Sequence, residues 1–146
     1  RIIFIDNQNY NNGIQLNQIN GPESDLPVTF IFSALKPVVL TGTITGNVRM
    51  FFAGDFQFGM GTETVAYNGL TMFMSNGDMK ICGSIWSDKN NPGGGFLSSD
   101  KDITIVESAS FQGQIQCRGN FKTSGLIQFN DSVLKAPGFT VPKGMK

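Results

Sequence analysis

The chain has 146 residues, with 11 basic and 11 acidic side chains, so it fits one domain (residues 1–146) and carries no net charge. Charged residues make up only 15% of the chain and histidine is absent, which removes the commonest general base and metal ligand. The neutral balance also excludes a nucleic-acid partner, since phosphate binding needs clustered Lys and Arg. We therefore expect no enzyme, no cofactor and no metal site.

The remaining composition predicts a β-rich domain with an amide-rich surface. Hydrophobic residues make up 40% of the chain, including 13 Phe, which is enough apolar surface for a core. There are 18 Gly and 21 Asn and Gln residues. No long segment has the 3.6-residue periodicity of a helix, and turn-forming residues recur too often for one, so helices are at most short. The longest apolar run is too short to cross a bilayer as a helix, so no membrane insertion is expected.

The first half of the chain predicts several short strands. The strands expected from runs of β-branched and aromatic residues are residues 2–5, 28–32, 38–44 and 48–52, and a further segment has Phe56, Phe58 and Met60 on one side. Residues 6–25, rich in Asn and Gln, predict a long loop. Residues 1–6 precede it as an apolar strand that a second copy of the chain could pair with.

The strongest pattern lies in residues 63–86, where Asn68-Gly69 and Asn76-Gly77 separate apolar runs. Asn-Gly suits the type I′ turn of a β-hairpin, so the pattern predicts a three-stranded antiparallel meander. In that register Met72 pairs with Ile81 and Met74 with Met79. One face is then almost entirely apolar and consists of Val65, Tyr67, Leu70, Met72, Met74, Met79, Ile81 and Ile85. Phe73 falls on the opposite, mixed face.

The second half repeats the strand pattern and ends in an extended segment. Strands are expected at residues 103–106, 111–117 and 126–129, and Gln112, Gln114 and Gln116 form a polar outer face in the second of them. Residues 136–146 contain Pro137 and Pro142, which favour an extended arm over a helix. With about ten short strands, the sequence predicts an antiparallel β-sandwich of jelly-roll type. A β-solenoid is the alternative, suggested by short similar segments at residues 42–48 and 113–117, although no fixed repeat length connects them.

Two cysteines, Cys82 and Cys117, permit one disulfide bond or two free thiols, and the sequence leaves both possibilities open. The carboxylates lie mostly in or beside predicted turns, where Asp is expected for its short hydrogen bonds to the backbone. They form no recognisable catalytic or Ca²⁺-binding pattern.

The best candidate binding site lies where the meander leads into a Gly-rich loop at residues 87–102. Trp86, the single Trp, could stack on a sugar ring, and Asp88, Asn90 and Asn91 could bind its hydroxyl groups. This site predicts a carbohydrate- or receptor-binding β domain, with a glycan as a possible ligand. The alternative is that Trp86 simply covers the end of the core.

The leading functional hypothesis is a non-enzymatic structural subunit of an extracellular or virion assembly, of the fibre, pilus or capsid type. It depends on low charge, an amide-rich surface and strand-like termini at residues 1–6 and 136–146 that could pair with another copy. The expected state is a homo-oligomer or polymer joined through these terminal strands.

Overall fold

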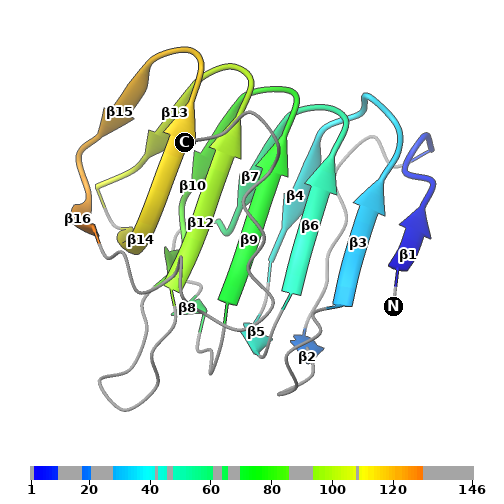
Figure 1. Cartoon of the computed structure of the whole chain (residues 1–146), viewed down its shortest axis with the longest axis horizontal. Coiled ribbons are helices and arrows are strands. Elements are labelled where there is room, and N and C mark those ends of the chain that lie inside the picture. The colour runs from blue at the N-terminus through cyan, green and yellow to red at the C-terminus, as the bar shows by residue number, and fades with distance from the viewer. Residues whose placement is uncertain are drawn as a thin grey trace.

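The computed structural model describes residues 2–9, 18–20, 28–41, 43–45, 48–60, 64–65, 70–85, 94–107 and 109–129. Within these ranges it contains sixteen strands and no helix. Every pairing between these strands is parallel. Figure 1 shows the strands lying side by side in rows and pointing the same way. The chain therefore coils as a β-solenoid, in which each turn of the coil, or rung, stacks on the one before.

The predicted antiparallel jelly-roll sandwich is wrong, because no antiparallel strand pair occurs among the described residues. The β-solenoid named as the alternative has the parallel strand arrangement that is observed. Parallel neighbours cannot be joined by two-residue hairpins and need long connections. Here those connections are the other two faces of the coil.

The strands form three faces that run along the coil axis. Face A consists of β1 (Ile2–Ile5), β3 (Val28–Phe32), β6 (Val48–Phe52), β9 (Leu70–Ser75), β12 (Gly94–Ser99) and the second half of β14 (Ser110–Cys117). Face B consists of β4 (Val38–Leu40), β7 (Phe56–Phe58), β10 (Met79–Ile81), β13 (Ile103–Ile105) and β15 (Phe121–Thr123). Face C consists of β2 (Gln18–Asn20), β5 (Thr43–Thr45), β8 (Thr64–Val65), β11 (Ser84–Ile85), the first half of β14 and β16 (Leu126–Phe129).

The rungs have unequal lengths. On face B, successive strands begin at residues 38, 56, 79, 103 and 121, and these positions lie directly beside one another in the sheet. The spacings are therefore 18, 23, 24 and 18 residues. The loops between faces absorb the difference. A repeat search at a fixed period fails for this reason.

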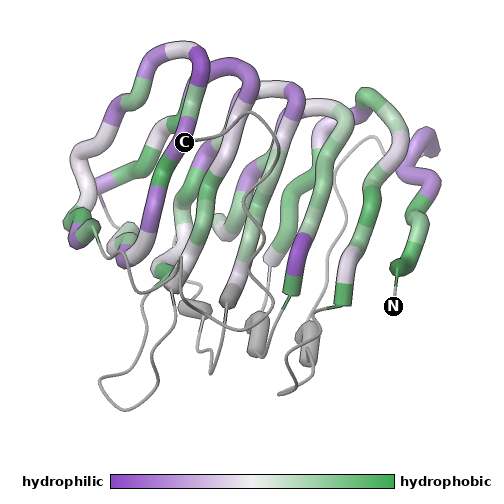
Figure 2. Tube along the Cα trace, in the orientation of Figure 1, coloured by the Kyte–Doolittle hydropathy of each residue, from purple (hydrophilic) through white to green (hydrophobic). Residues whose placement is uncertain are grey.

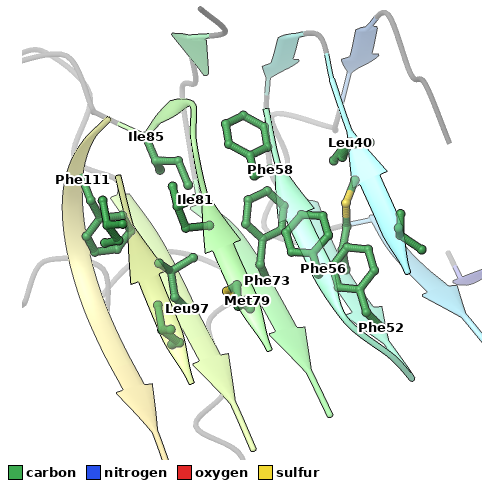
Figure 3. Packing of buried hydrophobic residues seen from close by; sticks show 14 of the residues in the cluster. Leu40, Phe52, Phe56, Phe58, Phe73, Met79, Ile81, Ile85, Leu97 and Phe111 are labelled. Carbon is green, nitrogen blue, oxygen red and sulfur yellow. The ribbon is translucent and has the colours of Figure 1, made fainter. Parts of the chain in front are cut away.

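The core lies between the faces and is built from columns, meaning residues at the same position in successive rungs. On face A one column contains Phe30, Met50, Phe73, Leu97 and Ile115. On face B one column contains Phe56, Met79 and Ile103, all of which are buried. Alternation along each strand places every second side chain in such a column. Figure 3 shows four of these side chains, Phe56, Phe73, Met79 and Leu97, among those that meet between the faces.

Phenylalanine rings fill the centre of the core. The Phe52 and Phe56 rings, from faces A and B of one rung, stack with centroids 3.8 Å apart. The Phe32 ring stacks on Phe52 from the preceding rung, at 4.9 Å. The Phe73 ring lies 4.9 Å from Phe56 and 5.5 Å from Phe58. Ring stacking across rungs adds to simple burial and fixes how the faces meet.

The predicted meander of residues 63–86 is also wrong. Asn76-Gly77 does not close a hairpin, because β9 pairs with β6 and β12 and β10 pairs with β7 and β13. Asn76 and Gly77 instead form the corner between faces A and B. A side chain at Gly77 would overlap the Asp55 carboxylate of the rung before, so the corner requires glycine. Asn68-Gly69 lies outside the described residues.

The change of topology also changes which side chains face inward. Phe73 is fully buried in the core cluster, although the hairpin register placed it on the mixed face. Met72 and Met74 lie in register with Arg49 and Phe51, on the opposite side of β9 from Phe73, although Met72 is buried and Met74 half-buried. The predicted pairs Met72 with Ile81 and Met74 with Met79 do not form.

Several predicted strands are present, but some of their boundaries and buried residues differ from the prediction. Residues 38–44 form two strands on different faces, β4 and β5, instead of one. Phe56 and Phe58 are buried as expected, but Met60 is exposed. The alternation predicted for residues 111–117 is confirmed in β14 for Phe111, which is buried, and for the half-buried outer Gln side chains.

Candidate functional site

The corners between faces A and B form a continuous ladder along one edge of the solenoid. The Asp55 carboxylate accepts a hydrogen bond from the Asp78 amide of the next rung (2.8 Å). The Asp78 carboxylate does the same for the Asp102 amide (3.2 Å), and Asp102 for the Asn120 amide (2.7 Å). The four rungs that contain Asp55, Asp78, Asp102 and Asn120 are thus joined in succession by charge-assisted hydrogen bonds. These carboxylates have a structural role.

Two serines reinforce the same ladder from the inside. The Ser75 hydroxyl donates to the Gly54 carbonyl of the preceding rung (2.7 Å) and accepts from the Gly77 amide (2.9 Å). The Ser99 hydroxyl donates to the Gly77 carbonyl (2.6 Å) and accepts from the Lys101 amide (2.9 Å). Both hydroxyl groups are therefore satisfied where they are buried, as buried polar groups must be.

A shallow groove of about 400 Å³ runs beside this ladder on the outer side of face B. Its polar lining includes the three ladder aspartates together with Gln57, Lys80 and Thr104. The one aromatic residue in the lining, Phe56, is buried in the core. The groove therefore presents no open aromatic face on which a sugar ring could stack.

A second groove, of about 510 Å³, lies on the outer side of face A. Ile31, Phe51 and Met74 line it, and they form one row across β3, β6 and β9. The same row begins with the exposed Phe4 on β1 and becomes polar at Ser98 and Gln116. The apolar part of this outer surface thus extends to β1, at the N-terminal end of the stack of rungs. Figure 2 shows the apolar colouring along β1 and β3.

At each end of the stack, the outermost rung has a neighbouring rung on one side only among the described strands. At the first end, β1 pairs with β3 through one edge, and no described strand lies on its other edge. Its inward side chains, Ile3 and Ile5, lie in the same columns as the buried Met50 and Phe52 but are only half-buried. The first end therefore exposes both a strand edge and the open core.

The last end, formed by the second half of β14, β15 and β16, also exposes apolar side chains. In one column of face B, Phe56 is 2% exposed, Met79 1% and Ile103 0%, but Phe121 is 38% exposed. No described strand lies beyond Phe121 to cover it. Leu126 and Phe129 on β16 are also exposed. Of the large hydrophobic side chains exposed in the described part of the chain, Ile2, Phe4, Phe121, Leu126 and Phe129 lie on the end strands, and Leu35 and Met60 do not.

The first end is held firmly in place by Asn7. This side chain is fully buried. Its amide nitrogen donates to the carbonyls of Ala34 (3.3 Å) and Lys36 (3.2 Å), and its amide oxygen accepts from the Ala34 amide (2.7 Å). The turn after β1 is thereby fastened to the corner of the following rung. The exposed edge of β1 is consequently a preformed surface.

The predicted sugar-binding residues Trp86, Asp88, Asn90 and Asn91 lie outside the described residues, and the site remains a prediction. Residues 136–146 of the predicted arm lie outside them as well, whereas residues 2–5 form β1. Cys82 and Cys117 are both free thiols, the first buried and the second half-buried. Within the described ranges no three Cys, Asp or Glu side chains are grouped to hold a metal ion. No helix long and apolar enough to span a membrane is found there either.

Sequence reasoning missed the corner ladder and the open last end. A signal for the ladder is present, because Ser75-Asn76-Gly77-Asp78 and Ser99-Asp100-Lys101-Asp102 share Ser and Asp at the same positions 24 residues apart. The corner Gly54-Asp55-Phe56 matches the end of this pattern one rung earlier. A search for short corner motifs at variable spacing would have found it.

Comparison with known proteins gives no family and no relative. No family model matches the chain, and neither a curated protein nor a solved structure is significantly similar to it.

Proposed function

We propose that this protein is a non-enzymatic structural subunit whose β-solenoids stack end to end. The observation that carries the proposal is the exposure of the end columns. Ile3, Ile5 and Phe121 continue the buried columns of the core, yet they are partly open to solvent. Solenoids that stay monomeric need polar capping repeats at both ends, and no such cap is present among the described strands.

The chemistry of both ends favours association with another β-strand surface. An open strand edge presents unpaired N–H and C=O groups that another strand can satisfy. Each fully buried large apolar side chain contributes about 1.5–3 kcal/mol. Several together, with the main-chain hydrogen bonds, are comparable with the roughly 4–15 kcal/mol lost on association. The free energy gained by contact through one end rung is therefore large enough to offset the cost of association.

Support against a catalytic role comes from the aspartates that line the face B groove. Asp55, Asp78 and Asp102 each hold the next rung through a backbone amide. Removing one would weaken the stack, so these carboxylates serve the architecture. The extracellular or virion location stays a prediction from the composition, and glycan binding stays a prediction at Trp86.

Blocking either end is expected to abolish assembly. The variants Phe4→Lys and Phe121→Lys each place a charge on an end strand, a device by which natural sheets prevent edge pairing. Both side chains are already exposed, so the fold should persist. In sedimentation velocity and electron microscopy, the native chain should form elongated particles and each variant should sediment as a monomer.

Leu35→Lys is the matched control, because Leu35 is 81% exposed but lies on the corner between β3 and β4 and not on an end strand. It should assemble like the native chain. A native chain that stays monomeric at all concentrations, or a Leu35→Lys variant that dissociates as completely as Phe4→Lys, would refute the proposal.

A further inference from the structure

We propose that successive copies join head to tail, with β1 of one copy pairing in parallel with the second half of β14 of the next, so that face A continues across the junction. This inference rests on the proposed function and specifies its interface. The occupant of each open end is the opposite end of a second copy of the same chain.

Strand direction supports this arrangement. All strands of face A point the same way, and β1 and β14 are the two strands at its ends. Within the described part of the chain, β1 has a free edge away from β3, and residues 114–117 of β14 have a free edge away from β12. A copy placed further along the same axis therefore presents β1 to β14 in the parallel orientation that every other pair uses. The opposite ends carry complementary edges.

The columns fix the register of the junction. Ile2, Thr29, Arg49, Met72, Phe96 and Gln114 form one row across face A. Continuing the row places Ile2 of the neighbouring copy beside Gln114. Ile3 then lies beside Ile115, Phe4 beside Gln116 and Ile5 beside Cys117.

The side chains match in this register. Ile115 and Cys117 are half-buried inward residues packed against the core, and Ile5 packs against it at the other end. The junction therefore brings aliphatic side chains and a thiol into one continued core column. A shift by one residue would bring Gln116 opposite an inward isoleucine, and burying that amide without a partner is unfavourable. A head-to-tail contact of this kind does not close on itself and generates a filament.

Residues in adjacent parallel strands lie about 4.8 Å apart, within the range of about 4.4–6.8 Å between Cα atoms that a disulfide can bridge. The test is therefore the variant Ile5→Cys, oxidised mildly and analysed on a non-reducing denaturing gel. We expect a ladder of dimers, trimers and longer species, formed between the introduced thiol on β1 of one copy and Cys117 of its neighbour. Reduction should collapse the ladder to a single monomer band.

Two controls define the register and the polarity. Phe4→Cys places the thiol one residue away on the outer side of the sheet, and it should give no ladder with Cys117. Ile5→Cys combined with Cys117→Ser should give no crosslinked species. Dimers in that double variant would show two first ends in contact and would overturn the head-to-tail inference.

The size of the particles separates this inference from the proposed function. If Ile5→Cys still forms elongated particles by sedimentation but no ladder appears, the register is wrong and the structural role stands. If native chain and variant are both monomeric, the structural role itself fails and the junction with it.

Discussion

Replacing Gly113 by alanine is expected to destabilise the protein by about 3–5 kcal/mol, because the backbone there combines a strained conformation with close packing. Gly113 has φ of 147°, a region that residues with a side chain rarely adopt. A Cβ at this position would overlap the carbonyl oxygen of Gly95 on the neighbouring strand. Guanidinium unfolding measures the loss as a lower midpoint at unchanged slope.

The physical reason for this glycine is the path of β14. Residues 110–113 pair with β16 on face C, whereas residues 113–117 pair with β12 on face A. Gly113 therefore lies where one strand passes from one face to the next without an intervening loop. The matched control is Gln114→Ala on the same strand, whose half-buried outer side chain should cost well under 1 kcal/mol. Equal stability of the two variants would contradict the bent path of β14.

Replacing Phe73 by alanine is expected to cost about 3–5 kcal/mol, as for other fully buried phenylalanines. Phe73 has no exposed surface, and its ring contacts the rings of Phe56 and Phe58 and lies 6.4 Å from that of Phe52. The variant leaves a cavity at the centre of the aromatic cluster. Chemical denaturation followed by circular dichroism measures the change.

Phe51→Ala is the control for this prediction. Phe51 lies on the adjacent strand β6 but points to the outside of face A and is half-buried. The decrease in the free energy of unfolding should be clearly smaller for Phe51→Ala than for Phe73→Ala. The antiparallel meander predicted from the sequence placed Phe73 on the mixed face, so a small effect at Phe73 would favour that arrangement over the solenoid.

Much of the secondary structure could be predicted from the sequence, because strand formation depends on local residue type. The apolar runs at residues 28–32, 48–52 and 111–117 all form strands. Alternation correctly separates inward from outward residues within β14. These signals act over a few residues and do not depend on which strands become neighbours.

Strand pairing could not be predicted, because it depends on residues distant in the chain. Asn76-Gly77 has the local conformational preference of a hairpin turn. In the structure, the hydrogen bond from the Asp78 amide to Asp55 and the packing of Gly77 over that corner favour a turn between faces instead. Both arrangements satisfy the local pattern. Only contacts with the preceding and following rungs distinguish the corner from a hairpin turn.

The open ends were anticipated only in part. The apolar strand at residues 2–5 led to the hypothesis of pairing with another copy, and β1 does form the first strand of face A. Phe121 carried no such signal, because its exposure results from its place in the last described rung and not from its neighbours in sequence. The exposed apolar surface at the last end therefore results from how the rungs stack, and the local sequence does not predict it.

The parallel stacking of rungs is tested most directly by nuclear Overhauser effects between backbone protons of isotopically labelled protein. The solenoid predicts that the backbone of Phe73 is close to Met50 on one side and Leu97 on the other. Contacts between Met72 and Ile81 across an antiparallel hairpin, with none from Phe73 to Met50 or Leu97, would contradict it.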